Sequence, residues 1–212
     1  MAMSRELYDA IVNGNNKQAH AATQAAIEAG VKPMALVADT MIPAMDEVGK
    51  LFEEEEYFVP ELLLSGRAMK GAMALLRPLI VASGEKLSAK VVIGTVKGDL
   101  HDIGKNLVAS MLEGSGFEVI DLGIDVAPEK FVAAVIQQQP QIVCMSALLT
   151  VTMPSMKTTI DALKAAGLRS KVKVMIGGAP VTTQYASEIG ADGYSENANA
   201  AVALVRTLLA VA

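Results

Sequence analysis

Residues 91–104 read Val-Val-Ile-Gly-Thr-Val-Lys-Gly-Asp-Leu-His-Asp-Ile-Gly. The first six are apolar or small, as in a buried strand, and the rest predicts a turn that leads into a helix. His101 lies in this turn, two positions after Asp99. Ligands of open α/β sheets bind beyond the carboxyl ends of the strands, so the turn is expected at a binding edge. An imidazole beside a carboxylate there is suited to act as a base or as a metal ligand.

The chain after residue 86 alternates short β-branched runs with amphipathic segments. Strands are predicted at residues 90–96, 117–122, 142–146, 172–176 and 193–195. Helices are predicted at residues 103–113, 128–138, 152–166, 182–189 and 197–211. Buried strands alternating with helices predict a parallel sheet covered on both faces. Residues 87–212 are therefore expected to form an α/β domain, a doubly wound five-stranded parallel sheet of the flavodoxin-like or Rossmann-like kind.

The chain before residue 87 has a helical period and no strand pattern. Apolar residues recur every three to four positions in segments 6–30, 33–45 and 60–76. Gly30 is a suitable helix end and Pro33 a suitable helix start. Residues 52–57 carry four consecutive glutamates and predict an exposed connection. Residues 1–86 are thus expected to form an N-terminal bundle of about four helices.

The composition limits the class of protein. The 212 residues are 52% hydrophobic and 19% charged, which indicates a globular chain of one large or two small domains. A net charge of −5 argues against a nucleic-acid partner. No segment approaches the roughly 20 apolar residues of a membrane span, and the N-terminus does not resemble a secretory signal. The single cysteine, Cys144, excludes an intramolecular disulfide and fits the cytoplasm. Cys144 is expected to be buried packing, and the second histidine, His20, a surface residue.

Three groups of small or polar residues follow the first, third and fourth predicted strands. They are Asp99, His101 and Gly104; then Ser146 and Leu148 with Thr150 and Thr152; then Gly177 and Gly178. Loops after neighbouring parallel strands share one edge of the sheet. Glycine lets a ligand approach the backbone closely. These residues predict a cleft with a floor of small side chains and His101 at its rim.

This three-part pattern resembles the cobalamin-binding domain of corrinoid-dependent methyltransferases, which reads Asp-x-His-x-x-Gly, then Ser-x-Leu, then Gly-Gly. Residues 105–145 place 41 positions between the first two elements, and residues 149–176 place 28 between the last two. Both spacings match the family pattern. The helical half also resembles the family's cap domain, so the resemblance covers nearly the whole chain. Similar proteins include cobalamin-dependent methionine synthase and the small corrinoid proteins of methanol, methylamine and aryl methyl ether systems.

The resemblance implies cobalamin or a related corrinoid as the cofactor, with His101 as the lower axial ligand of cobalt. Asp99 would accept the other imidazole N–H, and either Thr150 or Thr152 would extend that relay. The base and tail of the cofactor would thread a slot past Ser146 and Gly177-Gly178. Further cofactor contacts are implied for Gly98, Leu100, Asp102, Ile103, Gly104, Leu148, Tyr194 and Ala198, and in the cap for Phe52, Val59 and Leu62. Asp102 has an equal alternative as the N-cap of the following helix.

The implied function is that of a methyl carrier without catalytic residues of its own. It would accept a methyl group on cob(I)alamin from a substrate-specific methyltransferase and pass it to a second methyltransferase that uses tetrahydrofolate or a thiol. A reductive activase would be a further partner. The alternatives are the B12-binding subunit of a mutase, a B12-sensing regulator, and a plain flavodoxin-like module. A mutase subunit needs no helical cap, a regulator needs a DNA-binding segment, and a plain module does not explain the three spacings.

Overall fold

The computed structural model describes residues 2–84 and 89–210. The chain divides into two compact units, one of residues 1–88 with 110–117 and one of residues 89–109 with 118–212. The predicted domain boundary between residues 86 and 87 lies outside the described residues.

The N-terminal unit is helical, as predicted. Its helices are α1 (Ala2–Val12), α2 (Asn16–Glu28), α3 (Pro33–Leu36), α4 (Ile42–Glu53) and α5 (Val59–Ser83). A π-helical turn, Val37–Met41, joins α3 and α4 into one continuous helical run. Pro43 follows this turn and has no N–H to bond the carbonyl of Asp39, which accounts for the local widening. Residues 2–84 therefore form four helical rods, α1, α2, the α3–α4 run and α5.

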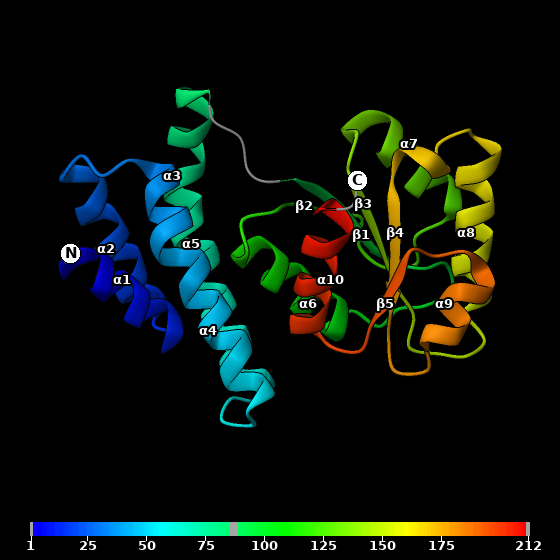
Figure 1. Cartoon of the computed structure of the whole chain (residues 1–212), viewed down its shortest axis with the longest axis horizontal. Helices are drawn as coiled ribbons and strands as arrows, with labels where there is room; N and C mark the ends of the chain where they lie inside the picture. Colours follow the sequence, from blue (N-terminus) through cyan, green and yellow to red (C-terminus); the bar gives the residue numbers. More distant parts are fainter. Residues whose placement is uncertain (1, 85–88, 211–212) are drawn as a thin grey trace. The chain divides into compact units, whose positions relative to one another are not determined.

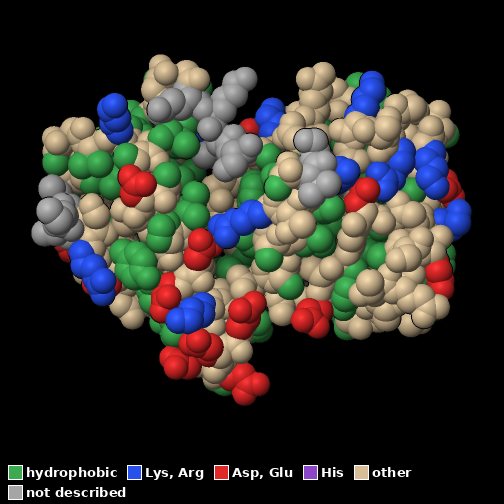
Figure 2. All heavy atoms as spheres, in the orientation of Figure 1, with side chains coloured by type: hydrophobic (Ala, Val, Ile, Leu, Met, Phe, Trp, Pro, Cys, Tyr) green, Lys and Arg blue, Asp and Glu red, His purple; other side chains and the backbone are tan. Residues whose placement is uncertain are grey.

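Two helix ends in this unit differ from the predicted ones. Helix α5 continues through Pro78 to Ser83 and ends at Gly84, whose φ of 76° is the left-handed conformation that glycine favours. Helix α4 includes Phe52, so the connection begins later than predicted. The glutamates of residues 53–56 are exposed, and Figure 2 shows acidic side chains gathered where the α4–α5 turn lies in Figure 1.

The second unit contains the five predicted strands. They are β1 (Lys90–Thr95), β2 (Glu118–Asp121), β3 (Ile142–Ser146), β4 (Lys173–Gly177) and β5 (Gly193–Ser195). The strands are all parallel, in the order β2-β1-β3-β4-β5. This is the flavodoxin-like strand order of a doubly wound sheet. The direction in which successive strands are added to the sheet reverses between β1 and β3.

Helices cover both faces of this sheet. They are α6 (Ile103–Gly114), α7 (Pro128–Gln138), α8 (Pro154–Ala165), α9 (Thr183–Ile189) and α10 (Ala198–Ala210), with a short 3-10 helix at Arg169–Lys171. Figure 1 shows α8 and α9 on one side of the sheet and α6 and α10 on the other. Phe131 of α7, Ile160 of α8 and Ile189 of α9 share one apolar core with β1, β3 and β4. Cys144 is buried in β3, as predicted.

The strand register aligns the carboxyl ends of four strands. Thr95 pairs with Ser146, Ser146 with Gly177, and Gly177 with Ser195. The loops that follow β1, β3 and β4 therefore leave the sheet from the same edge.

Candidate functional site

The turn after β1 is built around a buried carboxylate. Asp99 has no exposed surface, and its Oδ1 accepts a hydrogen bond from the backbone N–H of His101 at 3.1 Å. The same oxygen lies 2.7 Å from His101 Nδ1. The His101 side chain is 49% exposed. Its ring is therefore bound to Asp99 at Nδ1 and accessible to solvent elsewhere.

The second oxygen of Asp99 binds the loop after β3. Oδ2 accepts hydrogen bonds from the backbone N–H groups of Leu148 at 2.8 Å and Leu149 at 3.2 Å, and from Thr152 Oγ1 at 2.6 Å. Thr152 is buried and Thr150 is exposed. Of the two threonines left open by the sequence, Thr152 is the one in contact with Asp99.

These donors determine the charge of Asp99. Burial by itself raises the pKa of this carboxyl group, but the hydrogen bonds from Thr152, His101 and the backbone of Leu148 outweigh it. The net pKa lies well below the ordinary value, so Asp99 is an ionised carboxylate that can only accept. Nδ1 of His101 is then the donor, and in the neutral ring Nε2 keeps its lone pair for a metal ion.

The glycine pair at the end of β4 is closely packed, and Gly178 has no room for a side chain. Gly178 has a φ of 129°, and a Cβ there would lie 1.9 Å from the carbonyl oxygen of Ala147. A Cβ at Gly177 would lie 3.1 Å from the carbonyl oxygen of Ser195. The backbones of the loops after β3 and β4 therefore approach one another closely at Ala147 and Gly178, beside the half-buried Ser146, and Gly177 pairs with Ser195 in the sheet.

Large apolar side chains surround the histidine at this edge and are exposed to solvent. Leu100 and Ile103 flank His101 in the chain, and Leu148, Leu149 and Val151 lie in the loop that Asp99 binds. Their exposed fractions run from 42% for Leu149 to 79% for Val151. Exposed apolar side chains gathered at one place mark a surface that binds a ligand or partner.

The other predicted site residues lie in varied surroundings. Gly98 and Asp102 are exposed in the β1–α6 turn, and Gly104 is exposed in the first turn of α6. Oδ2 of Asp102 accepts from Asn106 Nδ2 at 3.0 Å. Tyr194 is half-buried in β5, and Ala198 is buried at the start of α10. In the helical unit, Phe52 is half-buried, Val59 exposed and Leu62 buried. That Phe52, Val59 and Leu62 contact the cofactor as cap residues stays a prediction.

Two residues that hydrogen-bond the turn were not among the predicted site residues. Thr95 Oγ1 donates to the carbonyl oxygen of His101 at 2.9 Å, and Asp125 Oδ1 accepts from the N–H of Gly98 at 2.7 Å. Thr95 is the last residue of β1, so the strand-end rule that selected Ser146 applies to it as well. Asp125 follows the second predicted strand, where the same rule gives a weaker signal.

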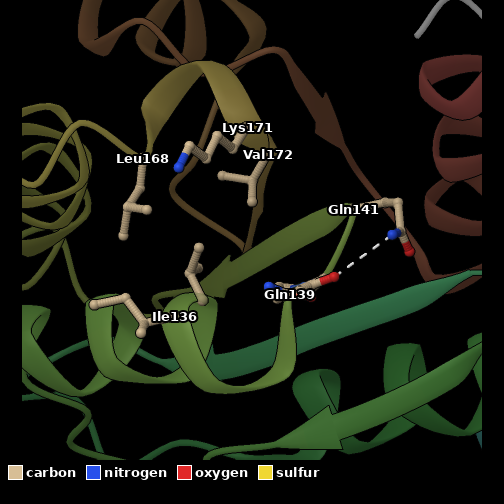
Figure 3. Close-up of a pocket in the computed structure, with 8 residues that line it drawn as sticks. Ile136, Gln139, Gln141, Leu168, Lys171 and Val172 are labelled. Atoms are coloured by element: carbon tan, nitrogen blue, oxygen red, sulfur yellow. Dashed lines mark hydrogen bonds between the residues drawn. The ribbon is translucent and has the colours of Figure 1, made fainter.

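A cavity of about 370 Å³ lies at the opposite edge of the sheet. Figure 3 shows it between the end of α7, with Ile136 and Gln139, and the segment from Leu168 to Val172. Gln141 and Val172 directly precede β3 and β4, so this cavity lies at the amino ends of the strands and is separate from the His101 edge.

Comparison with known protein families finds two matches, each described as a B12 binding domain. One covers residues 89–203 and the other residues 3–77. Trimethylamine corrinoid protein 2 of Methanosarcina mazei is 45% identical over 188 residues, 88% of this chain and 86% of that protein. The dimethylamine corrinoid protein of Methanosarcina barkeri is 41% identical over 97% of both chains.

Solved structures give the same result. A chain of the methanol:cobalamin methyltransferase complex of Methanosarcina barkeri superposes with a TM-score of 0.89 and 32% identity, over 100% of this chain and 81% of that one. A cobalamin-binding protein of Desulfitobacterium hafniense gives a TM-score of 0.79 and 36% identity, over 97% and 98% of the two chains. Within residues 2–84 and 89–210, no helix is long and apolar enough to cross a membrane.

Proposed function

The chain belongs to the family of B12-binding-domain proteins, and from this premise we propose that it is a corrinoid protein that carries a methyl group between two methyltransferases. The observation that carries the proposal is the Asp99–His101 pair at the carboxyl edge of β1, with Nδ1 of the ring bound and the rest of the ring accessible. The names of the methylamine corrinoid relatives favour this function over a mutase subunit or a regulator.

The residues at this edge suit a corrinoid. The exposed apolar side chains of Leu100, Ile103 and Val151 offer contacts to a broad, largely apolar macrocycle. The glycine pair lets the tail of the cofactor approach the backbone beside Ser146. When bound, the corrinoid supplies a cobalt centre that takes up and gives away a methyl group.

The protein's own part is to bind and orient. His101 would offer Nε2 to the cobalt, and Asp99 fixes the tautomer and the ring plane through Nδ1. Thr152 and the backbone of Leu148 and Leu149 hold Asp99 in its ionised form. The ligand is therefore oriented before any cofactor arrives, which lowers the entropic cost of binding.

Partner enzymes supply the chemistry of both transfers. A substrate-specific methyltransferase would load the methyl group, a second one would deliver it to tetrahydrofolate or a thiol, and a reductive activase would restore the reduced cofactor. We include a cytoplasmic location in the same proposal, because the chain has a single, buried cysteine.

Electron paramagnetic resonance of the protein loaded with cob(II)alamin tests the axial ligand. The nitrogen splitting of the cobalt signal should change when the protein is labelled with ¹⁵N-histidine and the vitamin is not. His101→Ala should keep bound corrinoid and lose the label-sensitive splitting. His20→Ala is the matched control, since it removes the other histidine from an exposed helical position. A splitting that ignores the label would overturn the assignment of His101.

The carrier function is tested with a methyl-labelled donor. Methylamines and methanol, each with its methyltransferase, are incubated with reduced holoprotein, and the protein is then separated in the dark. Label should remain with the wild-type protein and pass on after a second methyltransferase and its acceptor are added. Label that never associates with the holoprotein for any donor would contradict methyl carriage.

A further inference from the structure

The segment that follows β2 lies against the end of β1 and extends the sheet pairing beyond the strands. The N–H of Thr95 donates to the carbonyl oxygen of Gly123 at 3.0 Å, and the N–H of Val126 donates to that of Thr95 at 2.9 Å. Val96 and Val126 form a parallel bridge. Ile93 pairs with Asp121, so the segment holds two more residues than β1 between these two pairs and still stays hydrogen-bonded to the strand that leads into the His101 turn.

Asp125 holds this turn at two points. Its Oδ1 accepts from the N–H of Gly98 at 2.7 Å, and its own N–H donates to the carbonyl oxygen of Asp99 at 3.0 Å. Gly98 has a φ of 85°, and Asp125 itself has a φ of 50°, which residues other than glycine seldom adopt. With this backbone conformation, the carboxylate of Asp125 faces the N–H of Gly98 and its own N–H faces the carbonyl oxygen of Asp99.

Lys105 anchors the same segment from the first turn of α6. It is only 3% exposed, and its Nζ donates to Oδ2 of Asp121 and to Oδ1 of Asn106, the latter at 2.8 Å. The other oxygen of Asp121 accepts from the N–H of Gly123 at 2.8 Å. A buried lysine near a helix N-terminus is unfavourable without partners, so its position is explained by these contacts.

We propose that Asp125 is a positioning residue for His101, with Lys105 as the buried anchor of the segment that carries it. Asp125 fixes Gly98 and Asp99, and Asp99 Oδ1 in turn fixes both the backbone N–H and the ring Nδ1 of His101. Without the carboxylate of Asp125, the N–H of Gly98 loses this acceptor, while Thr95 and the loop after β3 still hold the rest of the turn. The proposal rests on the role of His101 as axial ligand proposed above. It adds the residue that orients the imidazole ring.

The experiment compares Asp125→Ala with Asp125→Asn in the full chain loaded with cob(II)alamin. The readout is the ratio of corrinoid with the histidine nitrogen signal to corrinoid without it, together with the total corrinoid bound. Asp125→Ala should lower this ratio roughly three- to tenfold, the effect of losing the hydrogen bond from the N–H of Gly98 to the carboxylate of residue 125, at unchanged total binding. Asp125→Asn should restore most of the ratio, because its Oδ1 still accepts and asparagine tolerates a positive φ.

Lys105→Met should shift the ratio in the same direction, and Asp161→Ala, an exposed carboxylate of the same unit, should leave it unchanged. If Lys105→Met does not fold, as judged by circular dichroism, the Asp125 pair still decides the question. A wild-type ratio in Asp125→Ala, even with a lower melting temperature, would overturn the proposal and leave the axial role of His101 standing. Absence of the histidine signal from the wild-type protein would instead overturn the axial role itself.

Discussion

Thr152 Oγ1 lies 2.6 Å from Oδ2 of Asp99, although 53 residues separate the two in the chain. The hydrogen bond connects the loop after β3 to the turn after β1, at the point where the sheet reverses its winding. Both side chains are buried, so the contact is protected from competing water. The histidine that Asp99 orients is thereby fixed relative to two strands.

Thr152→Val tests this contact, because valine keeps the shape of threonine and removes the hydroxyl. The variant should lose about 1–2 kcal/mol in the free energy of unfolding, since Asp99 stays buried with one donor fewer. Thr150→Val is the matched control two positions away on the exposed side of the loop, and should stay within about 0.5 kcal/mol of the wild type. Urea unfolding of the apoprotein measures both. Equal losses in the two variants would contradict the assignment of Thr152.

Asp99→Ala should be more damaging than either threonine change. It removes the acceptor of the partly buried N–H groups of His101 and Leu148, and leaves the buried hydroxyl of Thr152 with the carbonyl oxygen of Leu149 alone. We expect a loss of more than about 3 kcal/mol in the free energy of unfolding. Asp161→Ala removes an exposed carboxylate and should leave the unfolding midpoint unchanged. A wild-type midpoint for Asp99→Ala would rule out the network.

Gly178→Ala should destabilise the protein by more than the strain of a positive φ alone, because the added methyl group would also clash beside the predicted cofactor slot. The added Cβ would meet the carbonyl oxygen of Ala147 at 1.9 Å, and a backbone atom cannot rotate away. Gly167→Ala is the matched control, with a φ of 67° and open space around the added atom. The control should cost about 1 kcal/mol and Gly178→Ala at least about 3 kcal/mol in thermal unfolding, with weaker corrinoid binding in the second variant alone. Equal costs would show that the loops separate easily.

Cys144 should be unreactive in the native protein. Burial in β3 raises the pKa of its thiol, so no thiolate is present at neutral pH. Alkylation by iodoacetamide, followed by mass spectrometry, should be on the order of a hundredfold slower in buffer than in concentrated urea, because reaction requires opening of the sheet. Similar rates in the two solvents would contradict the burial.

Much of the α/β unit was predictable because parallel strands buried on both faces are continuous apolar runs, as in residues 91–96. The same runs located Asp99 and His101 at a strand end. The choice between Thr150 and Thr152 was not predictable, since it depends on the turn in which the N–H of Thr152 donates to the carbonyl oxygen of Leu149.

Contacts between segments far apart in the chain account for the other differences between the predicted and the observed structure. Asp125 lies in a segment without a strand pattern, and its role arises only from the pairing of residues 123–126 with the end of β1. Helix α5 extends past Pro78, a residue that alone predicts a helix end. Its continuation to Ser83 places Ile80 in the buried core, a gain that local propensity does not register.

The two oxygens of Asp99 face hydrogen-bond donors on both sides, from His101 on one and from Leu148, Leu149 and Thr152 on the other. A carboxamide of the same size has one oxygen and one NH₂ group. In either orientation its NH₂ group would face the hydrogen-bond donors of one of the two loops. Asparagine is therefore a poor isostere at position 99, and only a symmetric double acceptor satisfies both loops together.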